Sequence, residues 1–147
     1  MLINMPQPDD LTIERITDLD LSADELWSLI STAEGWRSWL VDDTQLAVEP
    51  DAEGTATEDG LVREVRIDTI VDGRGVNFSW WDRDDPSSGS HVQLRIVELP
   101  DGRSQLHIAE QFVGAPATAV MSAEAMLSWD VRMVSLWLLA LHSTVMA

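Results

Sequence analysis

Glu110 is the polar residue of this chain whose position most favours chemistry. It lies in a segment of alternating apolar and polar residues, and side chains two residues apart in a strand point to the same face of a sheet. Leu106, Ile108 and Phe112 share the parity of Glu110, so the sequence predicts a carboxylate on the apolar face. A carboxyl group held there can orient a bound polar group or act as a general acid or base.

The two histidines of the predicted strands around residues 91–112, His91 and His107, do not form a metal site or a catalytic triad in the register that we predict. A hairpin with the three-residue loop 100–102 keeps the apolar residues of both strands on one face, and the glycine of this loop can take a positive φ. His107 then lies opposite Arg95, and His91 lies opposite Gln111. Both histidines are therefore on the polar face and do not pair with each other.

Other reactive groups are missing from the sequence or badly spaced. The chain has no cysteine, which excludes disulfides, thiolate catalysis and cysteine-based zinc sites. It lacks the nucleophile elbow of a serine hydrolase. The acidic residues between 51 and 59 do not have the spacing of an EF-hand calcium loop. We therefore assign no catalytic residue and expect no metal and no cofactor.

Tryptophan is over-represented, with seven residues in the chain, and each side chain can bury about 150–250 Å². Trp27 and Trp129 are most simply core residues. Other aromatic residues share an inward face with aliphatic side chains and can line a cavity. In this hypothesis Glu110 and Thr69 orient the bound molecule. The predicted ligand-binding residues are Trp39, Thr69, Phe78, Trp80, Leu94, Leu106, Ile108, Glu110, Met133 and Trp137.

These side chains need a helix and a sheet to position them, and the end of the chain supplies the helix. Residues 122–146 form one long predicted helix that is apolar on most of its circumference. Such a helix requires a curved sheet to pack against, and a pocket commonly remains between the two. One set of its apolar positions has the three-four spacing of a single face, namely Leu127, Val131, Val134, Leu138, Leu141 and Val145. A second set widens this stripe, namely Trp129, Met133, Leu136, Trp137 and Ala140.

The first part of the chain predicts a strand followed by two short helices. Residues 11–19 alternate loosely as a strand, after which the apolar spacing becomes helical. Ser22 and Glu25 form a capping box, in which each side chain accepts a hydrogen bond from the backbone of the other residue. We predict helices over 23–31 and 34–40.

The middle of the chain predicts hairpins. A weak edge strand or hairpin spans 45–57, a segment interrupted by a proline and a glycine. Two stronger runs, 61–71 and 76–81, are joined by a predicted two-residue turn at Gly73-Arg74. In that register Val71 faces Val76, Thr69 faces Phe78, Ile67 faces Trp80 and Arg66 faces Trp81.

The predicted order is one strand, two short helices, about five or six further antiparallel strands and a long final helix. This is an α+β arrangement in which the helix packs across one face of the sheet. With 147 residues, 45% of them apolar, the chain has the size of one domain. We predict a single domain over 11–147, preceded by an N-terminal extension over 1–10.

Short motifs along the chain also occur in a familiar order. They are Ile13-Glu14-Arg15, the run from Ser22 to Trp27, Trp39-Leu40, the run from Val76 to Trp80, Val92-Gln93-Leu94, the run from Ser104 to Ile108, and Trp129 with Met133 and Leu136. Together they resemble the START-like helix-grip (SRPBCC) superfamily, in the branch related to the C-terminal domain of the heat-shock-ninety ATPase activator. The resemblance covers residues 11–146. It departs from the family at Ser22, where the family usually has proline, and a capping serine serves the same structural purpose.

The resemblance implies a helix-grip fold, with a curved antiparallel sheet of about six or seven strands around the long C-terminal helix and a cavity between them. In the wider superfamily this cavity holds lipids, sterols, polyketides or plant hormones, and some members are cyclases or hydrolases. The activator itself uses an additional N-terminal domain. We therefore do not expect chaperone stimulation from this chain.

Charge and hydropathy argue against several classes of partner. The net charge of −17 comes from 26 acidic residues and nine arginines, and its field repels nucleic acids and anionic lipid surfaces. No apolar run approaches the ~20 residues of a membrane span. The first ten residues lack the basic and apolar parts of a signal peptide. We expect a cytoplasmic protein that binds neither nucleic acid nor membranes.

Three functions are compatible with these predictions. The first, which we favour, is binding of a small hydrophobic or aromatic molecule in a cavity between the sheet and the C-terminal helix. The second is an enzyme of the polyketide cyclase or dehydratase kind that uses Glu110 as acid or base. The third is a protein-interaction module, co-chaperone-like or dimerising, in which Trp137, Leu138 and Leu141 form a surface patch. A homodimer is compatible with the first function as well.

Overall fold

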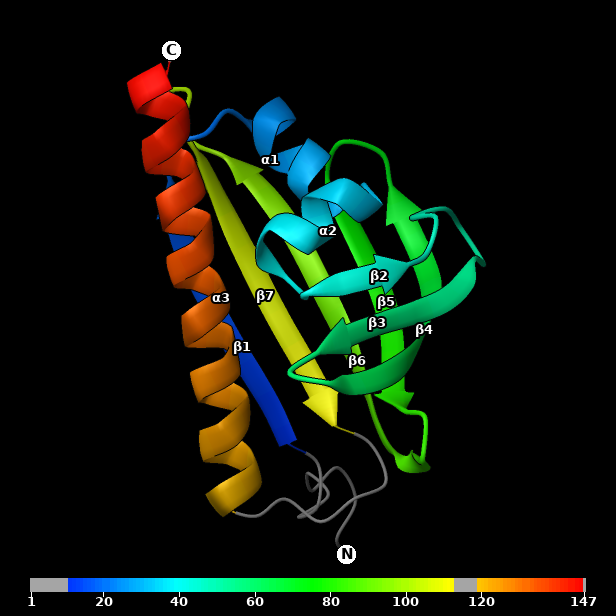
Figure 1. Ribbon diagram of the computed structural model, residues 1–147. Coiled ribbons are helices and arrows are strands. Elements are labelled where there is room, and N and C mark those ends of the chain that lie inside the picture. The colour runs from blue at the N-terminus through cyan, green and yellow to red at the C-terminus, as the bar shows by residue number, and fades with distance from the viewer. Residues whose placement is uncertain (1–10, 113–118, 147) are drawn as a thin grey trace, which may run out of the picture.

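The computed structural model, which describes residues 11–112 and 119–146, consists of a curved antiparallel sheet and three helices (Figure 1). Seven strands lie in the order β1-β7-β6-β5-β4-β3-β2. The strands are β1 (Leu11–Leu19), β2 (Asp43–Gln45), β3 (Glu53–Glu58), β4 (Leu61–Val71), β5 (Gly75–Asp82), β6 (Asp85–Glu98) and β7 (Ser104–Phe112). The helices are α1 (Ala23–Ile30), α2 (Ala33–Trp39) and α3 (Ala119–Met146). This architecture confirms the predicted α+β helix-grip fold, and the predicted extension over 1–10 lies outside the described residues.

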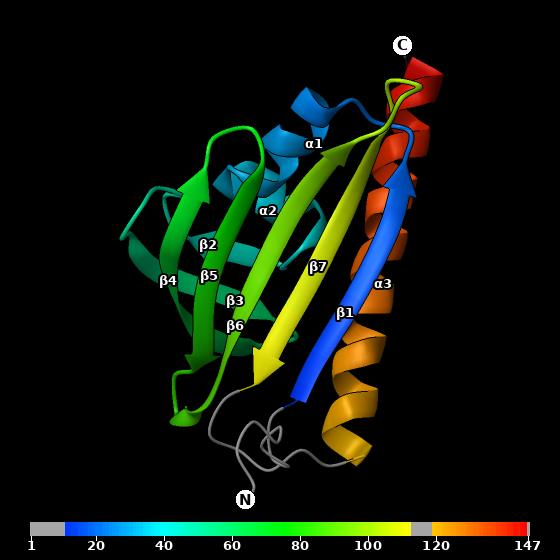
Figure 2. The same cartoon turned by 180° about the vertical axis from the view of Figure 1, so that it is seen from behind.

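All three helices lie on the concave side of the sheet. α3 runs beside β1 and β7, and α1 and α2 cover the end of the concave face next to the C-terminal half of α3 (Figure 1). The view from behind shows the outer face of the sheet, which no helix of the described residues covers (Figure 2). Among the described residues, no helix has both the length and the apolar character that a membrane span requires.

Local hydrogen bonding fixes the start of the fold as predicted. β1 has the predicted bounds, and the backbone N–H of Glu25 donates to Ser22 Oγ at 3.1 Å while that of Ser22 donates to Glu25 Oε1 at 2.9 Å. The capping box therefore begins α1 at the expected residue. Thr32 caps α2 in the same way, because its Oγ1 accepts a hydrogen bond from the Gly35 N–H at 2.9 Å.

The predicted register of the β6–β7 hairpin is confirmed. His107 pairs with Arg95, and His91 pairs with Gln111. Gly102 has a φ of 85° in the loop, as a three-residue connection requires. Because parity is preserved along both strands, the side chain of Glu110 is on the inner face and is only 5% exposed.

The predicted register of the β4–β5 hairpin is wrong. The turn contains the three residues 72–74, with Gly73 at a φ of 74°, rather than two. A bulge between Ile67 and Thr69 then shifts the pairing by one more residue. This bulge turns Thr69 outward while it keeps Ile67 buried. The observed pairs are Val71 with Gly75, Ile70 with Val76, Thr69 with Asn77, Ile67 with Phe78, Arg66 with Ser79 and Val65 with Trp80.

α3 has two apolar faces rather than one wide stripe. The face that packs on the sheet is buried and contains Ala125, Trp129, Met133, Leu136 and Ala140. The set with regular three-four spacing lies on the opposite, exposed side, namely Leu127, Val131, Val134, Leu138 and Leu141, and the side chain of its sixth predicted member, Val145, lies outside the described part. Trp129, the largest side chain of the two sets, is completely buried on the face that packs on the sheet, and the residues with the more regular spacing are left outside.

Candidate functional site

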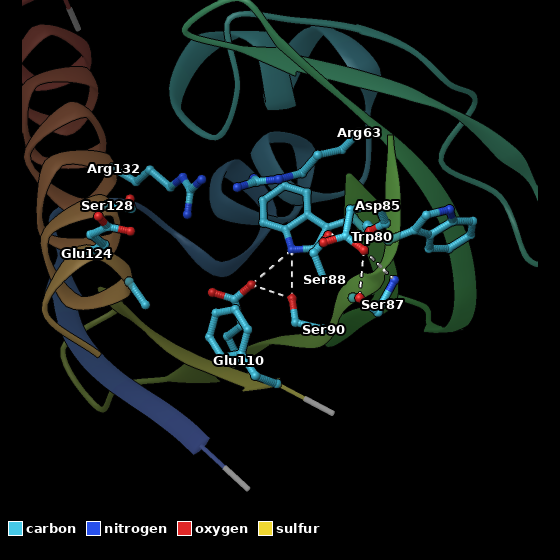
Figure 3. Close-up of a pocket in the computed structure, with 14 residues that line it drawn as sticks. Arg63, Trp80, Asp85, Ser87, Ser88, Ser90, Glu110, Glu124, Ser128 and Arg132 are labelled. Carbon is cyan, nitrogen blue, oxygen red and sulfur yellow. Dashed lines mark hydrogen bonds between the residues drawn. The ribbon is translucent and has the colours of Figure 1, made fainter. Parts of the chain in front are cut away.

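An open cavity of about 410 Å³ lies between the first half of α3 and the sheet, at the end away from α1 and α2 (Figure 3). The end of β5, the start of β6, the end of β7 and one residue of β4 complete its wall. The lining residues are Arg63, Trp80, Trp81, Asp85, Ser87, Ser88, Gly89, Ser90, Glu110, Phe112, Glu124, Ala125, Ser128 and Arg132. This wall combines aromatic rings with charged groups, so the cavity is less apolar than the sequence predicted.

Glu110 is at the base of the cavity and accepts hydrogen bonds from three side chains. Trp80 Nε1 donates to Oε2 at 2.9 Å, and Ser90 Oγ donates to the same oxygen at 2.6 Å. Trp129 Nε1 donates to Oε1 at 2.9 Å. Since indole N–H groups can only donate, Glu110 is the acceptor that joins a tryptophan of β5 to one of α3. This carboxylate therefore fixes the helix against the sheet.

Arg132 has several polar partners although it is buried in the cavity wall, where the residue is only 3% exposed. Its Nε donates to the carbonyl oxygen of Leu40 at 3.1 Å, and its Nη2 forms an ion pair with Glu58. The guanidinium also lies over the ring of Trp129, 4.5 Å from the centroid. Each of these contacts offsets part of the cost of removing the cation from water.

Arg63 is the second cation of the cavity, and its guanidinium has fewer polar partners than that of Arg132. Its guanidinium carbon lies 4.4 Å from the centroid of the Trp80 ring, and that of Arg132 lies 5.2 Å from the same centroid (Figure 3). Nη1 is buried and has no hydrogen-bond partner within the described residues, and Glu58 Oε1 is 3.6 Å away. Burial, followed by the charge of Arg132, lowers the pKa of Arg63 from its ordinary value. Because an arginine keeps its proton in proteins, this shift reflects a poorly solvated cation.

Only Trp80 and Glu110, of the ten predicted ligand-binding residues, line the cavity. Thr69 is exposed and accepts a hydrogen bond from Asn77, whereas Trp137 is 48% exposed on α3 and donates to Thr17. The six others are buried in the apolar core, namely Trp39, Phe78, Leu94, Leu106, Ile108 and Met133.

A tryptophan of α2 accounts for the position of the cavity. Trp36 is completely buried, and its ring centroid lies 4.7 Å from that of Phe78. Its Nε1 donates to the carbonyl oxygen of Ile30, so the indole can stay inside the core at little cost. The concave face is therefore filled beneath α1 and α2, and open space remains at the other end.

Sequence reasoning missed the two arginines, although a signal for each was present. Arg63 has the parity of Val65 and Ile67, which are buried on the inner face of β4. Arg132 lies three residues after Trp129 and four before Leu136, which places it on the buried side of α3. A charged residue on an apolar face is the pattern that would have identified both. Among the described residues, no group of three or more acidic or histidine side chains could hold a metal ion.

Comparisons with known proteins show the fold. No family model matches the chain, and no curated protein sequence matches it. The solution structure of an Aha1 dimer from Colwellia psychrerythraea is 13% identical with a TM-score of 0.72, over 86% of this chain and 93% of that one. The crystal structure of Ara h 8.0201 is 14% identical with a TM-score of 0.70, over 90% and 99%. CalU16 from Micromonospora echinospora is 19% identical with a TM-score of 0.65, over 86% and 73%.

Proposed function

We propose, from the helix-grip fold that the chain shares with these structures, that the protein binds a small aromatic molecule in the cavity between α3 and the sheet. The observation that carries this proposal is the open cavity of about 410 Å³, which lies within the range of about 300–1,000 Å³ typical of small-molecule sites. Trp81 and Phe112 supply aromatic surfaces in its wall, on which a planar molecule can stack.

A cavity-filling variant tests this proposal. Ser128 lines the cavity from α3, so Ser128→Trp places an indole in the space that the ligand would take. We expect the neutral dye N-phenyl-1-naphthylamine to bind the parent protein saturably, with increased emission. Binding to Ser128→Trp should be at least about tenfold weaker, since a loss of ~1.4 kcal/mol is sufficient for that change.

The matched control is Val71→Trp, which adds the same indole at the exposed end of β4, outside the cavity and the α3 helix, where Val71 is 56% exposed. This variant should bind the dye like the parent protein. Equal binding by Ser128→Trp and the parent would place the dye elsewhere and contradict the proposal, as would the absence of binding to the parent.

The geometry of Glu110 does not favour the cyclase-like alternative. Both carboxylate oxygens already accept hydrogen bonds, from Trp80, Ser90 and Trp129. This arrangement supports a structural role, in which Glu110 positions two aromatic side chains. We therefore propose no reaction for this carboxylate.

A second function, self-association through α3, is supported by its exposed apolar stripe, Leu127, Val131, Val134, Leu138 and Leu141. These side chains are 46–64% exposed and have the alternating four-three spacing of a coiled-coil seam. Met126 and Trp137 of the same helix are also exposed large apolar residues.

The distribution of charge favours a second copy of the chain as the partner that covers this stripe. The protein has a net charge of −17, so two copies repel each other over most of their surfaces. Within 123–142 only Glu124, Asp130 and Arg132 are charged. Asp130 is paired with Arg15 at 3.0 Å, and Arg132 is buried. The stripe is therefore a nearly neutral surface on which two acidic molecules can meet.

Light scattering after size exclusion tests this self-association. We expect the parent protein to have the mass of a dimer and Leu138→Glu to have the mass of a monomer, because a carboxylate in the middle of the stripe would have to be buried. Leu61→Glu, at an apolar residue of β4 that is 42% exposed, is the control and should remain dimeric. A monomeric parent protein at high concentration would exclude the dimer.

A further inference from the structure

We propose that the ligand of the cavity carries a carboxylate, and that the guanidinium of Arg63 binds it. This inference rests on the proposed function and adds the chemical class of the ligand, a small aromatic carboxylate. Arg63 has five N–H donors in a planar fork, which matches the two oxygens of a carboxylate.

The contrast between the two arginines of the cavity carries the argument. Arg132 donates to a backbone carbonyl and pairs with Glu58, whereas Nη1 of Arg63 is buried without a hydrogen-bond partner among the described residues. A buried donor without an acceptor is costly, and the great majority of such groups in folded proteins have partners. A ligand carboxylate would supply the missing acceptor.

The other charges of the site do not satisfy Arg63. Glu58 lies 3.6 Å from Nη1 but is already the partner of Arg132, which it contacts more closely. Glu110 is occupied by the hydrogen bonds of two indoles and a hydroxyl group. Because the guanidiniums of Arg63 and Arg132 also repel each other, an anion bound at Arg63 would lower the electrostatic energy of both.

The surroundings of Arg63 also determine how such a ligand would lie. Asp85 and Glu124 are exposed residues of the lining and carry negative charge, which disfavours a carboxylate there. The anionic end of the ligand would therefore point inward to Arg63, and its ring would lie toward Trp81 and Phe112.

Salt screens the repulsion between an anionic ligand and the protein, whose net charge is −17. The association rate should thus rise with ionic strength, unlike that of a neutral analogue.

Matched pairs of probes test this inference, namely 2-naphthoate with 2-naphthamide and benzoate with benzamide, by isothermal titration calorimetry at pH 7. The parent protein should bind a carboxylate about 10-fold to 100-fold more tightly than its amide, the usual effect of a charged hydrogen bond. Arg63→Gln should remove this preference and leave binding of the amide unchanged. Arg66→Gln, at an exposed arginine of the same strand, should keep the preference.

The outcomes separate this inference from the proposed function. If the parent protein binds amide and carboxylate equally, the carboxylate inference is wrong and the proposed function stands. If neither member of either pair binds, the proposed function fails and the inference fails with it. A preference that survives in a folded Arg63→Gln would overturn the role of Arg63. If Arg63→Gln does not fold, an association rate of 2-naphthoate to the parent protein that does not rise with salt contradicts the inference.

Discussion

Replacing Arg132 by methionine is expected to lower the free energy of unfolding by about 3–5 kcal/mol, the usual cost of breaking a buried ion pair by removing one partner. The change leaves Glu58 with only the more distant Arg63, whose Nη1 is 3.6 Å away, and leaves the carbonyl oxygen of Leu40 without its donor. Methionine retains an unbranched apolar chain and so preserves much of the packing against Trp129. Urea denaturation followed by tryptophan emission measures the loss.

Arg63→Met is the contrasting variant for this prediction. It removes the guanidinium whose buried Nη1 has no hydrogen-bond partner among the described residues, so the free energy of unfolding should stay within about 1 kcal/mol of the parent value or rise above it. Equal losses in Arg63→Met and Arg132→Met would show that the two arginines have the same structural role. That result would contradict the division between a structural and a ligand-binding arginine.

Replacing Glu110 by glutamine should lower the free energy of unfolding by about 2–4 kcal/mol, because a buried donor loses its acceptor and two charge-assisted hydrogen bonds are weakened. The amide oxygen of glutamine can accept from Trp80 and Ser90 as Oε2 does. Its NH₂ group then faces the indole N–H of Trp129, and two donors meet in a buried site. Chemical denaturation of the purified variant measures the change.

Glu14→Gln provides the control for the same chemical substitution. Glu14 is exposed on β1, and an exposed carboxylate that is exchanged for an amide should change the free energy of unfolding by no more than about 0.5 kcal/mol. If Glu110→Gln proves as stable as Glu14→Gln, the carboxylate does not hold α3 to the sheet. The structural role given to Glu110 would then be wrong.

The parts of the fold that sequence reasoning predicted are those that local rules determine. Strand parity placed Glu110 on the inner face, and the capping box of Ser22 and Glu25 marked the start of α1. The β6–β7 register followed because a three-residue loop with glycine at its end keeps both apolar sets on a common face. In each case the deciding interaction lies within a few residues or within one hairpin.

The wrong predictions concern features that depend on contacts between residues far apart in the sequence. The bulge after Ile67 shifts the pairing by one residue, and in the shifted register Val65 and Trp80 are paired and buried. Nothing within the hairpin alone predicts this bulge. The two apolar faces of α3 could not be ranked, because each has helical spacing. The cavity lies away from most of its predicted lining because Trp36, from a different helix, fills the space beside Phe78.

The central claim, that the cavity between α3 and the sheet is a ligand site, is tested most directly by the indole N–H resonances of the seven tryptophans. In a ¹H–¹⁵N spectrum recorded with N-phenyl-1-naphthylamine, the resonances of Trp80 and Trp81, which line the cavity, should shift with ligand concentration. That of Trp36, buried in the filled part of the core, should not move. Shifts confined to the exposed Trp137, or no shift in any indole, would contradict the claim.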